Sequence, residues 1–133
     1  MSRLTDKAMA LRNDPAKHCN CAQTMLAAFA EDLGMSEEQA MKLGANFGGG
    51  MKMGSVCGTI TSAAMILGLK GIDDPRTLNR FYQKMKEGHD GDLDCFTLLK
   101  KNAARGGEKK AHCDAMICES IGYIEEILKE KAL

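Results

Sequence analysis

Residues that cap helices recur along this chain, each followed by apolar residues at helical spacing. Asn20, Ser36 and Asp74 are such residues, and Gln39 completes a capping box with Ser36. No segment of strand length shows the alternating apolar pattern of a half-buried β-strand. We therefore expect an all-α protein, a compact bundle of about six or seven helices.

The chain has 133 residues, which is the size of one domain, so residues 1–133 are predicted to form a single helical domain. The helical segments are predicted at 4–11, 21–33, 36–47, 59–69, 76–87, from 95 to about 105, and 109–131. The segment 59–69 has almost no polar side chains. A helix that is apolar on all sides belongs inside a protein, so we expect this one at the buried centre.

Charge and hydropathy exclude several classes of protein. Eighteen basic and eighteen acidic residues give zero formal net charge, so no electrostatic footprint for nucleic acid is expected. The start lacks the apolar core of a signal peptide, and no apolar run has transmembrane length. These features predict a cytoplasmic protein without membrane insertion. Thiols stay reduced in the cytoplasm, and a core of this size does not need disulfides.

The glycine-rich stretch from Asn46 to Gly58 is where we place the chemistry. Ser55 is predicted to cap the next helix, which puts Cys57 in its first turn. A thiol there meets the positive end of a helix dipole, so we expect a lowered pKa for Cys57. The glycines predicted to bring backbone against the site are Gly48, Gly49, Gly50 and Gly58. Nucleotide binding is not expected, because the P-loop lysine is missing and no strand precedes the glycines.

Two further cysteines share this placement at a helix start. Cys21 directly follows Asn20, and Cys95 directly follows Asp94, whereas Cys113 lies on the apolar face of the last helix. If these helix starts converge, their free amides would stabilise negative charge on thiolates or on a thiolate-bound cluster. The alternative is that all four cysteines are inert, small apolar residues of a helical core.

The remaining cysteines and the histidines carry weaker signals. Cys19 and Cys118 are predicted to be spectators, with Cys19 as an alternative resolving thiol for Cys21. His112 directly precedes Cys113, but neighbouring helical residues point about 100° apart. We therefore expect His112 to be an exposed surface residue.

Several short motifs are shared with one known family. They are Asn20-Cys21-Ala22-Gln23, Phe47-Gly48-Gly49-Gly50-Met51, Val56-Cys57-Gly58, Leu67-Gly68-Leu69, Cys95 and Cys113. On these motifs the chain resembles the C-GCAxxG-C-C family, which is named for redox activity, from about Asn20 to the end. One departure is at residues 56–61, where the family has Gly-Cys-Ala-x-x-Gly and only Cys57 matches in place.

The resemblance implies a small bacterial cytoplasmic protein with redox activity. The four characteristic cysteines of the family would be Cys21, Cys57, Cys95 and Cys113. The family is similar to a helical region of split-Soret cytochromes that is associated with an iron–sulfur centre, which makes such a cluster the implied cofactor. No haem-attachment motif is present, so haem is not expected.

Three functions are consistent with these observations. The four cysteines would ligate an iron–sulfur cluster or another metal for electron transfer, with zinc as the lesser choice. Alternatively, the protein carries out thiol–disulfide chemistry with Cys57 as the reactive thiol and Cys21 in the same site. The third alternative is a helical partner-binding module with inert cysteines. A redox partner protein and a homo-oligomer are the expected kinds of partner.

Overall fold

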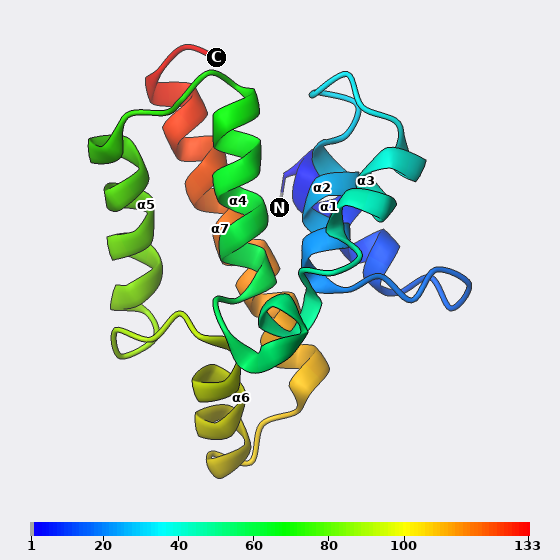
Figure 1. The fold of residues 1–133 in the computed structure, drawn as a ribbon, viewed down its shortest axis with the longest axis vertical. Coiled ribbons are helices and arrows are strands. Elements are labelled where there is room, and N and C mark those ends of the chain that lie inside the picture. Colours follow the sequence, from blue (N-terminus) through cyan, green and yellow to red (C-terminus); the bar gives the residue numbers. More distant parts are fainter. Residues whose placement is uncertain (1) are drawn as a thin grey trace.

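Helices form all the extended regular structure of residues 2–133, the part of the chain that the computed structural model describes (Figure 1). The elements are α1 (Arg3–Arg12), α2 (Cys21–Phe29), α3 (Glu37–Gly44), the short turn η1 (Gly50–Gly54), α4 (Gly58–Leu69), α5 (Pro75–Glu87), α6 (Cys95–Ala104) and α7 (Lys109–Glu130). Within these residues the only β-type pairing is one isolated bridge. The all-α prediction is confirmed, and the number of helices is close to the predicted six or seven.

Helices α2, α4 and α7 contact one another and form the centre of the bundle. Helices α1 and α3 pack on α2, α5 packs on α4 and α7, and α6 lies at one end against η1 and the start of α7 (Figure 1). The largest fully buried side chains come from α2, α4, α5 and α7 and include Phe29, Ile66, Phe81, Met116 and Ile124. Helix α4 therefore occupies the central position that its apolar sequence predicted.

Most helix starts follow from their capping residues. The side chains of Asn20, Ser36 and Asp74 each accept a hydrogen bond from the backbone amide three residues later, and the first two form complete capping boxes. Helix α2 ends at Phe29, earlier than the predicted residue 33, because the chain tightens from Ala30 onward into a turn closed by Gly34 at φ +68°. None of the helices in the described residues has the length and apolar character needed to cross a membrane.

Candidate functional site

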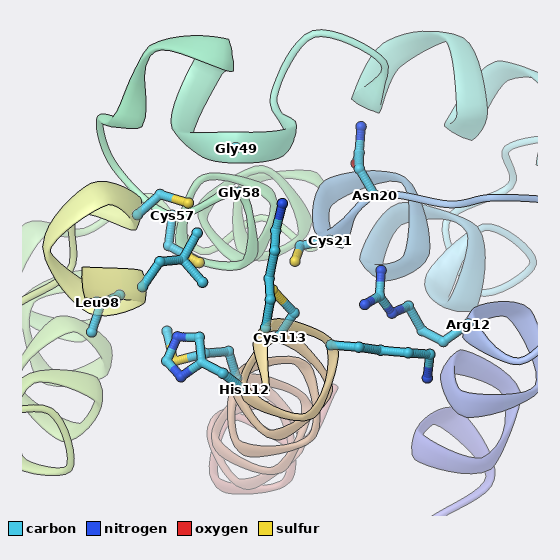
Figure 2. Close-up of a pocket in the computed structure, with 14 residues that line it drawn as sticks. Arg12, Asn20, Cys21, Gly49, Cys57, Gly58, Leu98, His112 and Cys113 are labelled. Carbon is cyan, nitrogen blue, oxygen red and sulfur yellow. The ribbon is translucent and has the colours of Figure 1, made fainter. Parts of the chain in front are cut away.

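Four cysteines from four different helices line one cavity at the α6 end of the bundle. The cavity has a volume of about 270 Å³, and its lining includes Cys21, Cys57, Cys95 and Cys113. Figure 2 shows Cys21, Cys57 and Cys113 converging on this space from α2, α4 and α7. We call it the cysteine pocket. The structure thus brings together the four cysteines that the sequence singled out.

The beginnings of four helices meet at the cysteine pocket. Helix α2 starts at Cys21, α4 at Gly58, α6 at Cys95 and α7 at Lys109, and each of these residues lines the cavity. Backbone amides in the first turn of a helix have no partner within the helix and carry the positive end of its dipole. The pocket is therefore built to favour negative charge.

A capping box fixes the position of Cys21. The Asn20 side chain accepts a hydrogen bond from the Gln23 amide at 2.8 Å, and the Gln23 side chain accepts one from the Asn20 amide at 3.0 Å. The side-chain NH₂ group of Asn20 also donates to the Gly44 carbonyl at 3.1 Å, which ties the start of α2 to the end of α3. Gly48 packs on this asparagine, since a Cβ there would lie 2.6 Å from the Asn20 Cβ.

A backbone bridge holds Cys57 beside Cys95. The Cys57 amide donates to the Leu93 carbonyl at 2.8 Å, and the Cys95 amide donates to the Ser55 carbonyl at 2.7 Å. These bonds flank the isolated antiparallel pairing of Val56 with Asp94. The bridge keeps residues 55–57 extended, and α4 begins at Gly58, one residue before the predicted start. Ser55 is not the N-cap of α4, and Cys57 itself occupies that position.

The four candidate glycines have different roles in the structure. Gly49 and Gly58 line the cysteine pocket, whereas Gly48 and Gly50 are buried against neighbouring chain. A Cβ on Gly50 would lie 2.2 Å from the Ser55 carbonyl oxygen, and one on Gly58 would lie 2.5 Å from the Phe47 carbonyl oxygen. The glycines therefore let the loop before α4 fold closely against itself and against α2.

Residues 49–52 form a run of left-handed backbone. Gly49, Gly50, Met51 and Lys52 have φ values between 59° and 64°, which only glycine adopts without cost. Holding Met51 and Lys52 there costs on the order of 1–2 kcal/mol each. The Ser55 amide closes the turn by donating to the Gly50 carbonyl at 2.9 Å. The turn delivers Ser55 to its contact with Cys95.

The thiols of Cys21 and Cys113 interact directly. Cys21 donates a hydrogen bond to the Cys113 sulfur, and this bond is the main cause that lowers the pKa of Cys113 to about 7. Burial opposes the shift, while the positive charges of Arg12 and Lys109 support it. The same hydrogen bond, with burial, raises the pKa of Cys21. Above a pH of about 7 the pair therefore holds one proton and one negative charge, with the charge on Cys113.

The prediction of a lowered pKa for Cys57 is wrong. Burial raises the pKa of this thiol, although the amides of Thr59 and Ile60 and the Thr59 hydroxyl lower it as a helix start should. The side chain is only 6 % exposed, so the loss of hydration exceeds the gain from the helix. Burial also raises the pKa of Cys95, and the charges of Cys57 and Cys113 add to this effect.

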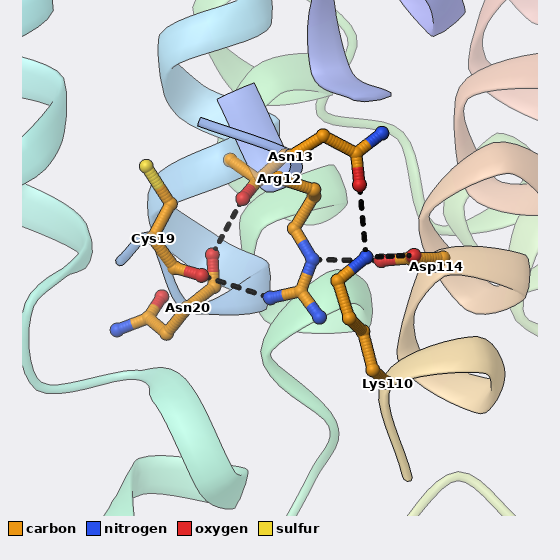
Figure 3. A network of polar contacts seen from close by, with 7 residues as sticks. Arg12, Asn13, Cys19, Asn20, Lys110 and Asp114 are labelled. Atoms are coloured by element: carbon orange, nitrogen blue, oxygen red, sulfur yellow. Dashed lines mark hydrogen bonds and ion pairs between the residues drawn. The ribbon is translucent and has the colours of Figure 1, made fainter. Parts of the chain in front are cut away.

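A polar network that the sequence did not predict anchors the Cys113 side of the pocket (Figure 3). The Arg12 side chain, 13 % exposed, donates to Asp114 at 2.7 Å and to the Cys19 carbonyl at 2.8 Å. Lys110 donates to Asp114 at 2.8 Å and to Asn13 at 3.1 Å. The network joins α1, the segment just before α2, and α7. Figure 2 shows the Arg12 guanidinium extending toward Cys21 and Cys113.

The other cysteines and the histidines lie as follows. Cys19 is buried with its thiol 3.8 Å from the Met41 sulfur, and neither Cys19 nor Cys118 lines the cysteine pocket. His112 does line it and is half-buried, so the prediction of an exposed His112 is wrong. Its ring lies edge-on to that of His89, with centroids 6.3 Å apart, and burial is the main cause of its lowered pKa.

The donor set of the pocket suits a thiolate-bound metal or iron–sulfur cluster, and the helix starts would offset the negative charge of such a cluster. Among residues 2–133, however, no three cysteine, histidine or acidic side chains are grouped closely enough to hold one ion. The thiols would have to approach further to bind a single zinc ion. A cluster spreads its thiolate ligands over separate iron atoms and needs less convergence.

The arrangement of four cysteines agrees with the comparison with known families. Residues 19–127 match the family described as "Putative redox-active protein (C_GCAxxG_C_C)". The chain belongs to this family. The C_GCAxxG_C_C match begins at Cys19 and includes all four cysteines of the pocket, but it leaves out Arg12. Comparisons with curated proteins and with solved structures gave no match.

Proposed function

We propose that the protein is a thiol–disulfide redox protein in which Cys113 and Cys21 form a reversible disulfide. The observation that carries this proposal is the meeting of these two thiols, from α2 and α7, in the lining of one accessible pocket. The interaction between them, which lowers the pKa of Cys113 and raises that of Cys21, agrees with it. Both side chains are half-buried, so a substrate can reach them while water is partly excluded.

The reaction follows from the distribution of charge. The Cys113 thiolate attacks one sulfur of a substrate disulfide, forms a mixed disulfide and releases the first substrate thiolate. The negative charge that raised the pKa of Cys21 has then gone, so Cys21 loses its proton more readily. Its thiolate attacks the Cys113 sulfur and releases the second substrate thiolate. The substrate gains two electrons, and the two cysteines lose two electrons in forming their disulfide.

The test is disulfide mapping of a variant that carries Cys19→Ser and Cys118→Ser, so that only the pocket cysteines remain. The reduced protein is treated with excess bis(2-hydroxyethyl) disulfide at pH 7.5 and digested, and the disulfides are identified by mass spectrometry. We expect a Cys21–Cys113 bond, and a mixed disulfide on Cys113 when Cys21 is replaced by serine. A first adduct on Cys57 would instead support Cys57 as the reactive thiol and contradict the proposal.

The second candidate function is electron transfer through an iron–sulfur cluster ligated by Cys21, Cys57, Cys95 and Cys113. It is supported by the four thiols and four helix starts around one cavity. When bound, such a cluster supplies one-electron transfer. Iron and sulfide analysis of anaerobically prepared protein tests it, since this candidate predicts a brown protein whose iron is lost when any one of the four cysteines is replaced.

A further inference from the structure

Apart from the Cys113 thiolate, the charged side chains that line the cysteine pocket are all positive. Arg12, Lys109 and Lys110 line the cavity, and no aspartate or glutamate does so among the described residues. Outside the lining, the carboxylate of Asp114 is bound to Arg12 and Lys110. Three positive charges and one negative charge leave a balance of two positive charges, on a chain whose total charge is zero.

The backbone adds to this excess of positive side chains. The four helix starts at the pocket add partial positive charge, of about half an elementary charge per helix. A cavity with an unmatched positive potential attracts anions and repels cations, and low-dielectric walls strengthen the effect.

The shape of the lining adds a second requirement on the ligand. The cavity volume of about 270 Å³ lies just below the range of about 300–1,000 Å³ of ordinary ligand pockets, which favours a compact ligand. Leu98, Leu99 and Met116 supply apolar surface beside the thiols. A short carbon chain that ends in an anionic group would satisfy both parts of the lining.

We propose that the cysteine pocket selects small anionic thiol compounds, and that its substrates are carboxylate-bearing disulfides. The proposal rests on the thiol–disulfide function proposed above for the choice of a disulfide, but the anion preference itself rests on Arg12, Lys109, Lys110 and the four helix starts. Lys109 is the best residue for a test, since no side-chain hydrogen bond or ion pair within residues 2–133 involves it.

The first arm of the test compares two alkylating agents that differ in charge, iodoacetate and iodoacetamide. The rate at Cys113 with each agent is measured by mass spectrometry and divided by the rate for the same cysteine in the urea-unfolded chain. We expect this normalised rate to be about tenfold higher for iodoacetate at low ionic strength, and the preference to shrink in 0.5 M salt. Equal normalised rates for the two agents would overturn the anion preference, whatever happens with disulfides.

Lys109→Glu should reduce the preference several-fold or reverse it. An acidic residue in the first turn of a helix is favourable, so this variant should fold. Lys129→Glu is the matched control, because it makes the same charge change on the same helix in its last turn, far from the pocket. An equal loss of preference in both variants would show that net charge, and not the pocket, sets the selectivity, and would contradict the proposal.

The second arm uses three disulfides of similar size, namely 3,3′-dithiodipropionate, bis(2-hydroxyethyl) disulfide and cystamine. Rates of protein oxidation are normalised to those of an unstructured cysteine peptide. We expect the dicarboxylate to react fastest and the diamine slowest. If all three form the Cys21–Cys113 bond at equal normalised rates, the substrate class is wrong and the thiol–disulfide function stands. If none does while the iodoacetate preference persists, the thiol–disulfide function is wrong, its substrate class fails with it, and the pocket still selects anions.

Discussion

The cysteine pocket contains two pairs of thiols, all four near the N-terminal ends of helices, and the two pairs differ in their chemistry. Cys57 and Cys95 lie at the starts of α4 and α6, joined by a backbone bridge, and both have raised pKa values. Cys21 and Cys113 share a hydrogen bond beside Arg12, and the pKa of Cys113 is lowered to about 7. A helix start alone therefore does not determine the charge of a thiol. A hydrogen-bond donor and nearby cations determine it here, and burial opposes both.

The largest expected effect comes from removing the charged thiol. At pH 7 Cys113 should react with iodoacetamide about threefold faster than a free cysteine, since its larger thiolate fraction outweighs its weaker nucleophilicity. The rate at Cys113 should exceed the rates at Cys57 and Cys95 by a larger factor, because the pKa values of those two thiols are raised. We expect Cys113→Ser to abolish the fast phase and Cys57→Ser to leave it unchanged. Cys118→Ser, on the same helix, is the control.

A fast phase that survives in Cys113→Ser and disappears in Cys57→Ser would reverse the roles of the two pairs. The variant has a second expected consequence. Because the hydrogen bond to Cys113 and the Cys113 charge raise the pKa of Cys21, replacing Cys113 should lower that pKa. Cys21 should then react faster in Cys113→Ser than in the unmodified protein.

The dependence of reactivity on pH should separate the two pairs next most strongly. With a pKa of about 7, the thiolate fraction of Cys113 rises from about a tenth at pH 6 to about nine tenths at pH 8, so its rate should rise about tenfold and then level off. Cys57 and Cys95 should still be gaining reactivity above pH 9, because their raised pKa values keep them protonated. Site-resolved alkylation from pH 5.5 to 9.5 measures both curves, and coincident curves would contradict the comparison.

Parts of this comparison could be predicted from the sequence and others could not. Capping is a local property, so Asn20 and its capping box placed Cys21 correctly at the start of α2. The bridge between Val56 and Asp94 is a single pairing and has no periodic pattern to detect. Without knowledge of it, Ser55 looked like a cap, although its carbonyl in fact accepts from Cys95.

The pKa values of the thiols could not be predicted from the sequence for a related reason. The effect of the first-turn amides on Cys57 follows from local sequence, but the burial that exceeds it depends on the packing of the whole bundle. Likewise, Arg12 and Asp114 are 102 residues apart, and neither lies in a motif. Sequence singled out the four cysteines that line the pocket, and tertiary structure decides which of them carries the charge.

Replacing Arg12 should weaken the difference between the pairs by a smaller amount. Arg12→Gln removes one of the positive charges that lower the pKa of Cys113, so the alkylation rate at pH 7 should fall about two- to fivefold. Arg12→Lys keeps the charge and should restore part of the rate. Arg80→Gln, which breaks an exposed ion pair with Glu130, is the control. An unchanged Cys113 rate in Arg12→Gln would show that the hydrogen bond from Cys21 is sufficient by itself.

The smallest expected effect on Cys113 comes from the glycine turn, which supports only the other pair. In Gly50→Ala the new Cβ would lie 2.2 Å from the Ser55 carbonyl oxygen, so we expect a loss of about 2–3 kcal/mol in the free energy of unfolding. Gly49→Ala is the matched control. The φ of Gly49 is +63° and that of Gly50 is +64°, but nothing lies within 4 Å of a Cβ on Gly49, so only the cost of left-handed backbone, about 1 kcal/mol, should remain.

Displacing Ser55 loosens the bond that holds the Cys95 amide, so Cys95 and Cys57 should become more accessible and react faster in Gly50→Ala. The Cys113 rate should change less than about twofold, because its partners Cys21 and Arg12 belong to α2 and α1. Urea unfolding and site-resolved alkylation measure the two effects, and a large change at Cys113 would mean that the four thiols behave as one coupled set and not as two pairs.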